Sequence, residues 1–333
     1  MGVPLSILDL APIRHGETAR ESIAASVALA QLAERTGYER VWYAEHHNMA
    51  AIASSATSVL IAHVAANTST IKLGSGGIML PNHSPLVIAE QFGTLAEIHP
   101  GRIELGLGRA PGSDQATTYA LRRDPATAEH FPQDVVELQG FLAGESKVRG
   151  VQATPGKGTR VPLYLLGSSL FGAQLAAALG LPYAFASHFA PSALQDAVAI
   201  YRRDFKPSAQ LDHPHVLAAV NVIASDTHEE AQAELRRVKI QRVGLLYGRG
   251  RSLTEADAEQ IVDSGEAVQL EEMTKYTAAG TPDEVKDYLE QFQKLADADE
   301  LIVAFAHTNT EGRLRSAEMT AEVVGQVASS GRA

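Results

Sequence analysis

Residues 71–107, IKLGSGGIMLPNHSPLVIAEQFGTLAEIHPGRIELGL, decide the fold. The stretch opens with an apolar run that predicts a strand over residues 71–80 and continues with a predicted helix over residues 85–98. It then returns to a predicted strand over residues 102–107. Because the strands are apolar throughout and a helix joins them, the pattern indicates neighbouring parallel strands of a sheet that is covered by helices.

The same alternation continues along the chain in both directions. Residues 17–36 place Ile23, Val27, Ala30 and Ala33 at steps of three and four, the spacing of a helix with one buried face. The predicted strands are residues 5–10, 40–43, 71–80, 102–107, 161–166, 183–187, 215–224 and 301–306. The predicted helices are residues 17–36, 54–66, 85–98, 133–142, 172–179, 192–205, 229–243, 282–295 and 312–327.

Eight strand and helix units in 333 residues fit a (β/α)₈ barrel, the TIM barrel of the α/β class, better than an open doubly wound sheet. We therefore expect residues 1–333 to form a single barrel domain. Three irregular insertions are expected near residues 110–129, 145–160 and 245–280. Long connections of this kind often act as lids or binding loops, although the middle one could equally be a turn without function.

Composition excludes several classes of function. The 28 Lys and Arg residues against 39 Asp and Glu give a formal net charge of −11, which is the wrong sign for a general nucleic-acid or membrane-surface binder. The chain has no cysteine, which excludes disulfides, thiolate metal sites and cysteine nucleophiles. No apolar stretch reaches the roughly 20 residues that span a bilayer. The expected location is the cytoplasm.

Polar residues collect where the predicted strands end, and this is the end at which such barrels build their active sites. The clusters are Asp9, Glu45-His46-His47-Asn48, Ser75-Gly76-Gly77, Pro81-Asn82-His83, Gly106-Leu107-Gly108-Arg109, Gly167-Ser168-Ser169, Ser187-His188-Phe189 and His307-Thr308-Asn309. At the opposite end, residues such as Glu39 and Arg40 resemble solvated loop residues. This asymmetry predicts one pocket at the ends of the strands.

The adjacent histidines of Glu45-His46-His47 argue against a metal. Neighbours on a strand face opposite sides, so His46 and His47 cannot both reach one ion, and no metal is predicted. One of the two should face the barrel mouth, where an imidazole suits proton transfer. A purely structural histidine is the alternative.

Two segments suit a phosphate group. The glycines around Arg109 lack the spacing of a dinucleotide-binding motif, but the arginine itself can donate several hydrogen bonds to phosphate. Gly167-Ser168-Ser169 joins a strand to a helix whose amino end attracts anions, unless one serine is simply an N-cap. The glycines between residues 74 and 77 suggest the close approach of something flat, an unusual backbone or a bulge without function.

These segments together resemble the bacterial luciferase-like superfamily of flavin-dependent monooxygenases, especially members related to the luciferase alpha chain. The resemblance covers nearly the whole chain. It rests on four segments: AEHHN at residues 44–48, GSGGIMLPNHSPL at 74–86, GRIELGLGRAPG at 101–112 and LGSSLFGAQLAAA at 166–178. Their order on successive strands carries the resemblance.

The resemblance implies a (β/α)₈ barrel that binds reduced FMN, reacts it with O₂ and oxygenates a small organic substrate. It places the active-site histidine at His46, and we expect Glu45 beside it to be catalytic as well. It places the family's non-prolyl cis peptide within Ser75-Gly76-Gly77, next to the flavin. It assigns the phosphate to Arg109 and to the turn of Gly167, Ser168 and Ser169. The luciferase alpha chain differs in having an acidic residue where Gly167 stands and a reactive cysteine, so light emission is not expected.

Several functions follow from these features. The first is a two-component FMN monooxygenase, acting on paired donors with incorporation of molecular oxygen and supplied with reduced FMN by a separate NAD(P)H:flavin reductase. The alternatives are an F420-dependent hydride-transfer oxidoreductase of the same fold, a non-catalytic flavin-binding protein, and a barrel enzyme without a cofactor that acts on a phosphorylated substrate. A homodimer packed through residues 54–66 is a further expectation of the resemblance.

Overall fold

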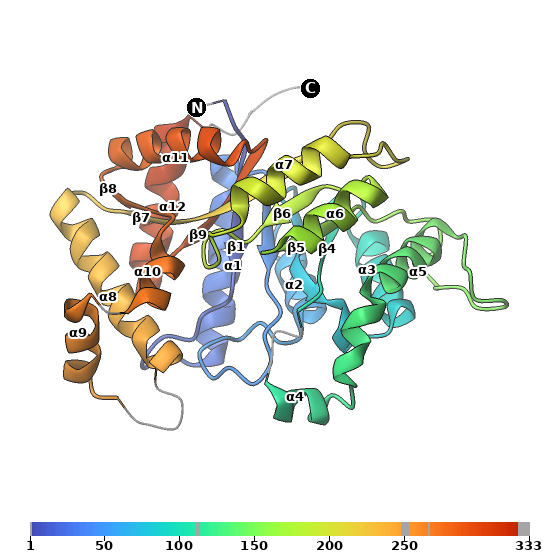
Figure 1. Cartoon of the computed structure of the whole chain (residues 1–333), viewed down its shortest axis with the longest axis horizontal. Helices are drawn as coiled ribbons and strands as arrows, with labels where there is room; N and C mark the ends of the chain where they lie inside the picture. Colours follow the sequence, from blue (N-terminus) through green and yellow to red (C-terminus); the bar gives the residue numbers. More distant parts are fainter. Residues whose placement is uncertain (1, 111–113, 248–252, 266, 326–333) are drawn as a thin grey trace.

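Within the described residues, eight parallel strands close into a barrel (Figure 1). The structure, a computed structural model, describes residues 2–110, 114–247, 253–265 and 267–325. The barrel strands are β1 (Leu5–Asp9), β2 (Arg40–Tyr43), β3 (Lys72–Met79), β4 (Ile103–Gly108), β5 (Leu163–Gly167), β6 (Tyr183–Phe185), β7 (Val216–Ala224) and β9 (Glu300–Phe305). They neighbour one another in that order, and the pairing of β9 with β1 completes the circle. The predicted (β/α)₈ barrel is confirmed.

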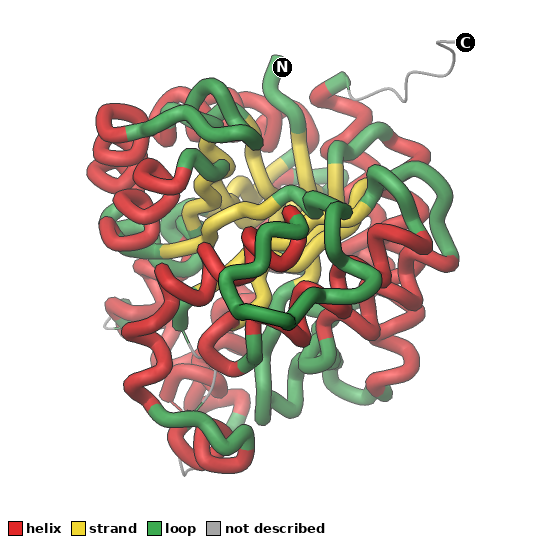
Figure 2. Tube along the Cα trace, turned by 90° about the vertical axis from the view of Figure 1, so that its right-hand side faces the viewer, coloured by secondary structure: helices red, strands yellow, loops and turns green. Residues whose placement is uncertain are grey.

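Helices surround the strands on the outside (Figure 2). They are α1 (Ala19–Thr36), α2 (Thr57–Ala66), α3 (Pro85–Ile98), α4 (Gln115–Ala120), α5 (Phe131–Ala143), α6 (Leu170–Leu179), α7 (Leu194–Asp204), α8 (His228–Tyr247), α9 (Glu255–Ser264), α10 (Val268–Thr274), α11 (Pro282–Ala296) and α12 (Thr310–Val324), with short 3₁₀ turns at Leu80–Asn82 and Pro125–His130. Local sequence sets their ends: α1 starts at a capping box of Thr18 and Glu21 and stops at Gly37, whose φ is 83°. Among the described helices, none combines the length and the apolar character needed to cross a membrane.

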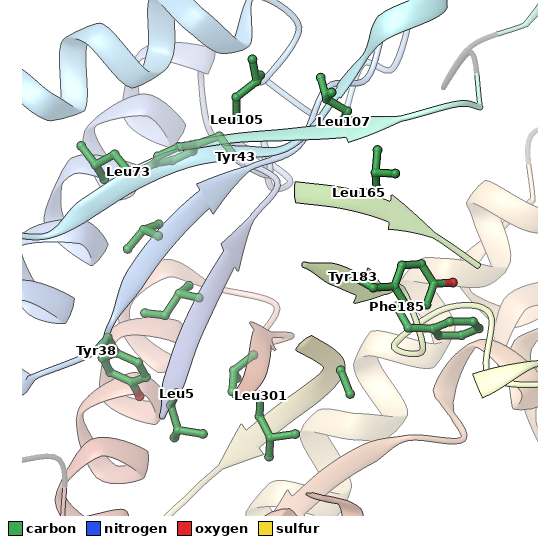
Figure 3. Packing of buried hydrophobic residues seen from close by; sticks show 14 of the residues in the cluster. Leu5, Tyr38, Tyr43, Leu73, Leu105, Leu107, Leu165, Tyr183, Phe185 and Leu301 are labelled. Carbon is green, nitrogen blue, oxygen red and sulfur yellow. The ribbon is translucent and has the colours of Figure 1, made fainter. Parts of the chain in front are cut away.

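Two apolar layers hold the barrel. The larger layer fills the space between strands and helices, and Figure 3 shows members of it such as Leu5, Tyr43 and Leu105. Alternate residues of the same strands point the other way, so that Leu8, Trp42, Tyr164, Ala184, Leu217, Ala219 and Ile302 pack against one another inside the barrel. The strands are therefore buried on both sides, which explains their continuous apolar sequence.

A network of charged side chains closes the amino end of the barrel interior. Arg40 Nε donates to Glu300 Oε1 at 2.9 Å, and Arg40 Nη1 donates to Glu104 Oε1 at 2.6 Å. Glu104 also accepts a bond from Trp42 Nε1 at 2.9 Å. The expectation that Arg40 is a solvated loop residue is wrong, because β2 begins at this residue and turns its side chain towards two buried carboxylates.

The glycines of β3 make room for Trp42. A Cβ atom on Gly74 would lie 2.9 Å from Trp42 Nε1, and one on Gly76 would lie 3.0 Å from Trp42 Cβ. Real side chains do not approach so closely, so the indole fits inside the barrel only because these positions lack a Cβ. The flat group that the glycines accommodate is thus, at least at these two positions, part of the protein itself.

The insertions are more regular than predicted. Residues 110–129 contain α4 and the turn Pro125–His130, and residues 245–280 contain α9, α10 and an additional strand, β8 (Thr277–Gly280). One edge of β7 pairs with β9. The other edge pairs first with the short β6, at residues 216–218, and then with β8, at residues 221–224. Residues 145–160 form neither helix nor strand, as predicted. Pro111, Gly112 and the predicted helix end at residues 326–327 lie outside the described residues.

Candidate functional site

Glu45 is the centre of a hydrogen-bonded cluster at the barrel mouth, the end where the parallel strands finish. It follows β2 and is 1% exposed. His47 Nε2 and His83 Nε2 each lie 2.8 Å from Glu45 Oε1, and the amide of Met79 donates to Oε2 at 3.1 Å. Glu45 therefore joins the end of β2 to the end of β3 and to the turn that follows it.

The hydrogen bonds of the cluster favour the charged form of Glu45. Burial alone would raise the pKa of Glu45, but the bonds from His47 and His83 outweigh it, so that this pKa lies below its usual value. The bond from Glu45 in turn raises the pKa of His47. The cluster is built to keep Glu45 ionised and His47 in position.

The same three side chains could hold a metal ion. Ligand atoms of Glu45, His47 and His83 all lie within 4.8 Å of one another. Sequence analysis weighed only the adjacent pair His46 and His47, and it missed this group because His83 lies on a different connection. The absence of a metal therefore stays a prediction.

His46 and His47 point apart, as alternation along an extended chain requires. His47 turns to Glu45, whereas His46 lies close enough to His188, which follows β6, to affect its pKa. Burial chiefly, with Arg242 and His46 adding to it, lowers the pKa of His188 to about 3. His188 is consequently a neutral imidazole across the physiological range.

The peptide bond between Gly76 and Gly77 is cis, within the segment where the resemblance places such a bond. Ser75 is fully buried, and its hydroxyl donates to the carbonyl oxygen of Gly106 at 2.8 Å. That hydroxyl is occupied inside the sheet, which leaves only the backbone of Ser75 for a cofactor. Contact of residues 75–77 with a flavin stays a prediction.

Arg109 and the turn after β5 come together at the mouth. The guanidinium carbon of Arg109 lies 4.1 Å from the ring centroid of Phe171, in the first turn of α6. Ser169 is the N-cap residue of α6 but makes no capping side-chain bond, and Tyr183 fixes the turn by donating to the carbonyl oxygen of Ser169 at 3.1 Å. Gly167, at the end of β5, is partly exposed, and Ser168 is exposed beside it. The arrangement offers an anion one cation and the uncapped amides of a helix.

Two further polar residues at the mouth, Asn221 and Arg242, were missed as site residues. Asn221 lies on β7 and is 1% exposed, and Arg242 of α8 donates to its side-chain oxygen at 3.2 Å. Asn221 in turn donates to the carbonyl oxygen of His188 at 2.7 Å. The polar Asn221 within an otherwise apolar strand was a usable signal, but Arg242 sits in an ordinary amphipathic helix and gave none.

The groups of the site are distributed around the mouth. The Gly76–Gly77 peptide belongs to β3, and β7 with Asn221 lies four strands away in either direction, which is the opposite wall. Arg109 and α6 follow β4 and β5, to one side.

Comparison with known proteins gives concordant matches. A family model described as luciferase-like monooxygenase matches residues 3–299. A luciferase-like monooxygenase of Escherichia coli (strain K12) is 47% identical over 96% of this chain and 97% of its own length. The N-acetyl-S-alkylcysteine monooxygenase of Bacillus subtilis (strain 168) is 31% identical over 97% of this chain and 98% of its own length. The crystal structure of apo-MsnO8 matches with a TM-score of 0.87 and 34% identity over 97% of this chain and 98% of that one.

More distant structures share the fold alone. The oxygenating constituent of 3,6-diketocamphane monooxygenase, solved in complex with FMN, has a TM-score of 0.73 at 17% identity over 98% of this chain and 99% of that chain. An F420-dependent secondary alcohol dehydrogenase, solved with an F420–acetone adduct, has a TM-score of 0.71 at 16% identity over the same shares of the two chains.

Proposed function

The chain belongs to the luciferase-like monooxygenase family, and we propose that it is a two-component monooxygenase that uses reduced FMN and O₂ to oxygenate a small organic substrate. A separate NAD(P)H:flavin reductase would supply the reduced FMN. When bound, reduced FMN supplies the electrons that activate O₂, while the protein binds, orients and shields it.

The observation that carries this proposal is the meeting of Arg109 with the start of α6. FMN differs from riboflavin by a phosphate, and a guanidinium beside the uncapped amides of a helix suits that group. The guanidinium of Arg109 stacks on the ring of Phe171, and this contact orients the cation in the absence of a ligand. We assign the phosphate to Arg109, Gly167, Ser168 and Ser169.

The wall of β3 is the proposed support for the flavin ring. The cis peptide between Gly76 and Gly77 lies towards the carboxyl end of β3, and we assign its backbone to the contact with the ring. The sides of these glycines where a Cβ would point face Trp42 and the backbone of Gly106, so they are not open to the ring. His46 stands at the end of the neighbouring strand β2, where its imidazole can hold or move a proton near the reacting atoms. We assign His46 a catalytic role on this ground.

Glu45 receives a different role. Its carboxylate is almost fully buried and is already bonded to His47, His83 and the amide of Met79. It therefore acts through the groups that it holds, and we regard it as a positioning residue that fixes the backbone on which His46 sits.

The proposal includes a homodimer located in the cytoplasm. Residues 54–66 were expected to form its interface, and α2 presents Val59, which is 67% exposed. The adjacent α3 adds Val87, which is 43% exposed. Two exposed branched apolar side chains on neighbouring helices favour a protein contact at this face.

An anaerobic titration tests the cofactor. The purified protein is titrated in parallel with reduced FMN, oxidised FMN and F420, and air is then admitted while absorbance is recorded. Preference for reduced FMN, followed by O₂-dependent reoxidation slower than that of free reduced FMN, would support the monooxygenase. Tight binding of F420 would favour hydride transfer, and stable flavin binding without reaction would indicate a flavin-binding protein. Failure to bind either would direct attention to a phosphorylated substrate.

A further inference from the structure

Arg242 brings a positive charge from α8 to the mouth of the barrel. Its Nη2 donates to Asn221 Oδ1 at 3.2 Å, and its Nη1 donates to the carbonyl oxygen of Met273 at 3.1 Å. Asn221 belongs to β7, and Met273 belongs to α10. The two bonds hold the guanidinium between the barrel wall and the helices of the insertion.

This charge has no counter-ion in the described part of the chain. Both of its hydrogen-bond acceptors are neutral, and burial lowers the pKa of Arg242 without an acidic neighbour to offset it. The two most deeply buried arginines are paired: Arg40 with Glu104 and Glu300, and Arg313 with Asp9 at 2.6 Å. Arg102, which like Arg242 is part-buried, also donates to neutral oxygens, but Glu34 is near enough to raise its pKa. Because an arginine stays charged and burial of an uncompensated charge is costly, an anion bound at this guanidinium of Arg242 would reduce that cost.

His188 provides a second unsatisfied group beside it. Its Nδ1 is buried and has no hydrogen-bond partner among the described residues. The ring is neutral, for the reason given above, so one nitrogen carries a hydrogen and the other accepts. Since Asn221 bonds both to Arg242 and to the backbone of His188, the two groups are held at one place.

We propose that Arg242, with His188 beside it, binds a carboxylate group of the organic substrate, which makes the substrates small organic carboxylates. The planar guanidinium matches the two oxygens of a carboxylate. Its place at β7, opposite the Gly76–Gly77 peptide and separated by β6 from the groups at β4 and β5, separates this site from the phosphate site at Arg109. The inference rests on the proposed function, because it names the substrate class of the same site.

Hexanoate and its neutral analogue hexanamide are the probes. Isothermal titration calorimetry measures both with the full chain, in the presence of saturating FMN so that Arg109 is occupied. Arg242→Gln removes the charge, and Arg242→Lys keeps it but removes the fork of donors. Arg237→Gln is the matched control, since it removes one positive charge from the same helix at a side chain that is 61% exposed and paired with Glu234.

We expect the unmodified protein and Arg237→Gln to prefer hexanoate to hexanamide. Arg242→Gln should raise the dissociation constant for hexanoate roughly tenfold to hundredfold, the effect of losing a charge-assisted hydrogen bond, and leave that for hexanamide unchanged. If circular dichroism shows that Arg242→Gln is unfolded, Arg242→Lys decides the matter, with a loss of several fold expected. No preference for hexanoate, or an undiminished preference in the folded Arg242 variant, would overturn the proposal.

The same samples separate this proposal from the proposed cofactor. Bound FMN without a preference for hexanoate would refute only the substrate class. Where FMN does not bind, the titration is repeated without it and with Arg109→Gln added. Binding of hexanoate that survives Arg109→Gln but is lost in the Arg242 variant would then support the carboxylate site while the FMN proposal fails.

Discussion

Replacing Arg109 by alanine should weaken the binding of FMN without weakening that of riboflavin. The two ligands share the ring system and the ribityl chain and differ only in the phosphate. A residue that contacts the phosphate alone must therefore discriminate between them, whereas a residue that shapes the ring pocket must affect both.

The magnitude follows from the geometry of the site. Hydrogen bonds to a charged group contribute about 1.5–3 kcal/mol. Arg109 is exposed and therefore partly screened by solvent and salt, which places its effect near the lower figure, roughly a tenfold rise in the dissociation constant for FMN. Ser168 adds a hydroxyl donor, and the double variant Arg109→Ala with Ser168→Ala should lose about 2–4 kcal/mol.

Fluorescence quenching of the oxidised flavins measures both affinities at low and at high salt. Arg35→Ala is the control, because it removes one positive charge from an exposed position in the last turn of α1, at the end of the barrel opposite the mouth. The FMN deficit of the Arg109 variant should shrink as salt rises. An equal loss for FMN and riboflavin would show that Arg109 acts by packing on Phe171, and unaltered FMN binding in the double variant would move the phosphate elsewhere.

His46→Ala should leave flavin affinity within a few fold but slow product formation; unchanged turnover in a coupled assay would remove His46 from proton transfer. Gly74→Ala should destabilise the fold by about 1–3 kcal/mol in urea unfolding, because the new Cβ would lie 2.7 Å from the carbonyl oxygen of Glu104. Gly244→Ala, with nothing within 4 Å of its Cβ, should not destabilise it. The pKa of His188 falls from 6.5 to about 3 on folding, so the unfolded chain binds more protons between these values and stability should rise with pH there by up to about 1.4 kcal/mol per unit. His188→Gln should reduce the rise of stability with pH, and an unchanged rise would show that it does not come from His188.

The strands of the barrel were predictable because a strand that is buried on both faces is apolar at nearly every position, and such a run can be recognised in the sequence. Runs such as residues 216–224 are apolar at every position but one, a pattern typical of a strand that is buried on both faces. The strand β8 was not predictable, because its sequence, TAAG, is short and made of small residues. It forms a strand by pairing with residues 221–224 of β7, which extend past the end of β6. Pairing between distant segments is not encoded in either one alone.

The site was predictable to the same extent. Glu45, Arg109 and the turn at residues 167–169 follow predicted strands directly, so the fold alone brings them to one end of the barrel. The partner of Glu45, His83, and the cation at Arg242 come from a turn and a helix whose orientation depends on tertiary packing. The local sequence shows where a strand ends, but it does not show which helix will place a side chain in contact with that end.

The two ends of the barrel differ less in polarity than in how far their polar groups are satisfied. At the amino end, Arg40 is bonded to two carboxylates and to Tyr164, so its charge is compensated within the protein. At the mouth, Arg242 has neutral partners and His188 has a buried nitrogen without one among the described residues. Buried polar groups without hydrogen-bond partners destabilise the folded protein, and such groups can persist at a site where a ligand supplies the missing partners. Our proposal places the substrate at Arg242 and His188 on this ground, without using any resemblance to other proteins.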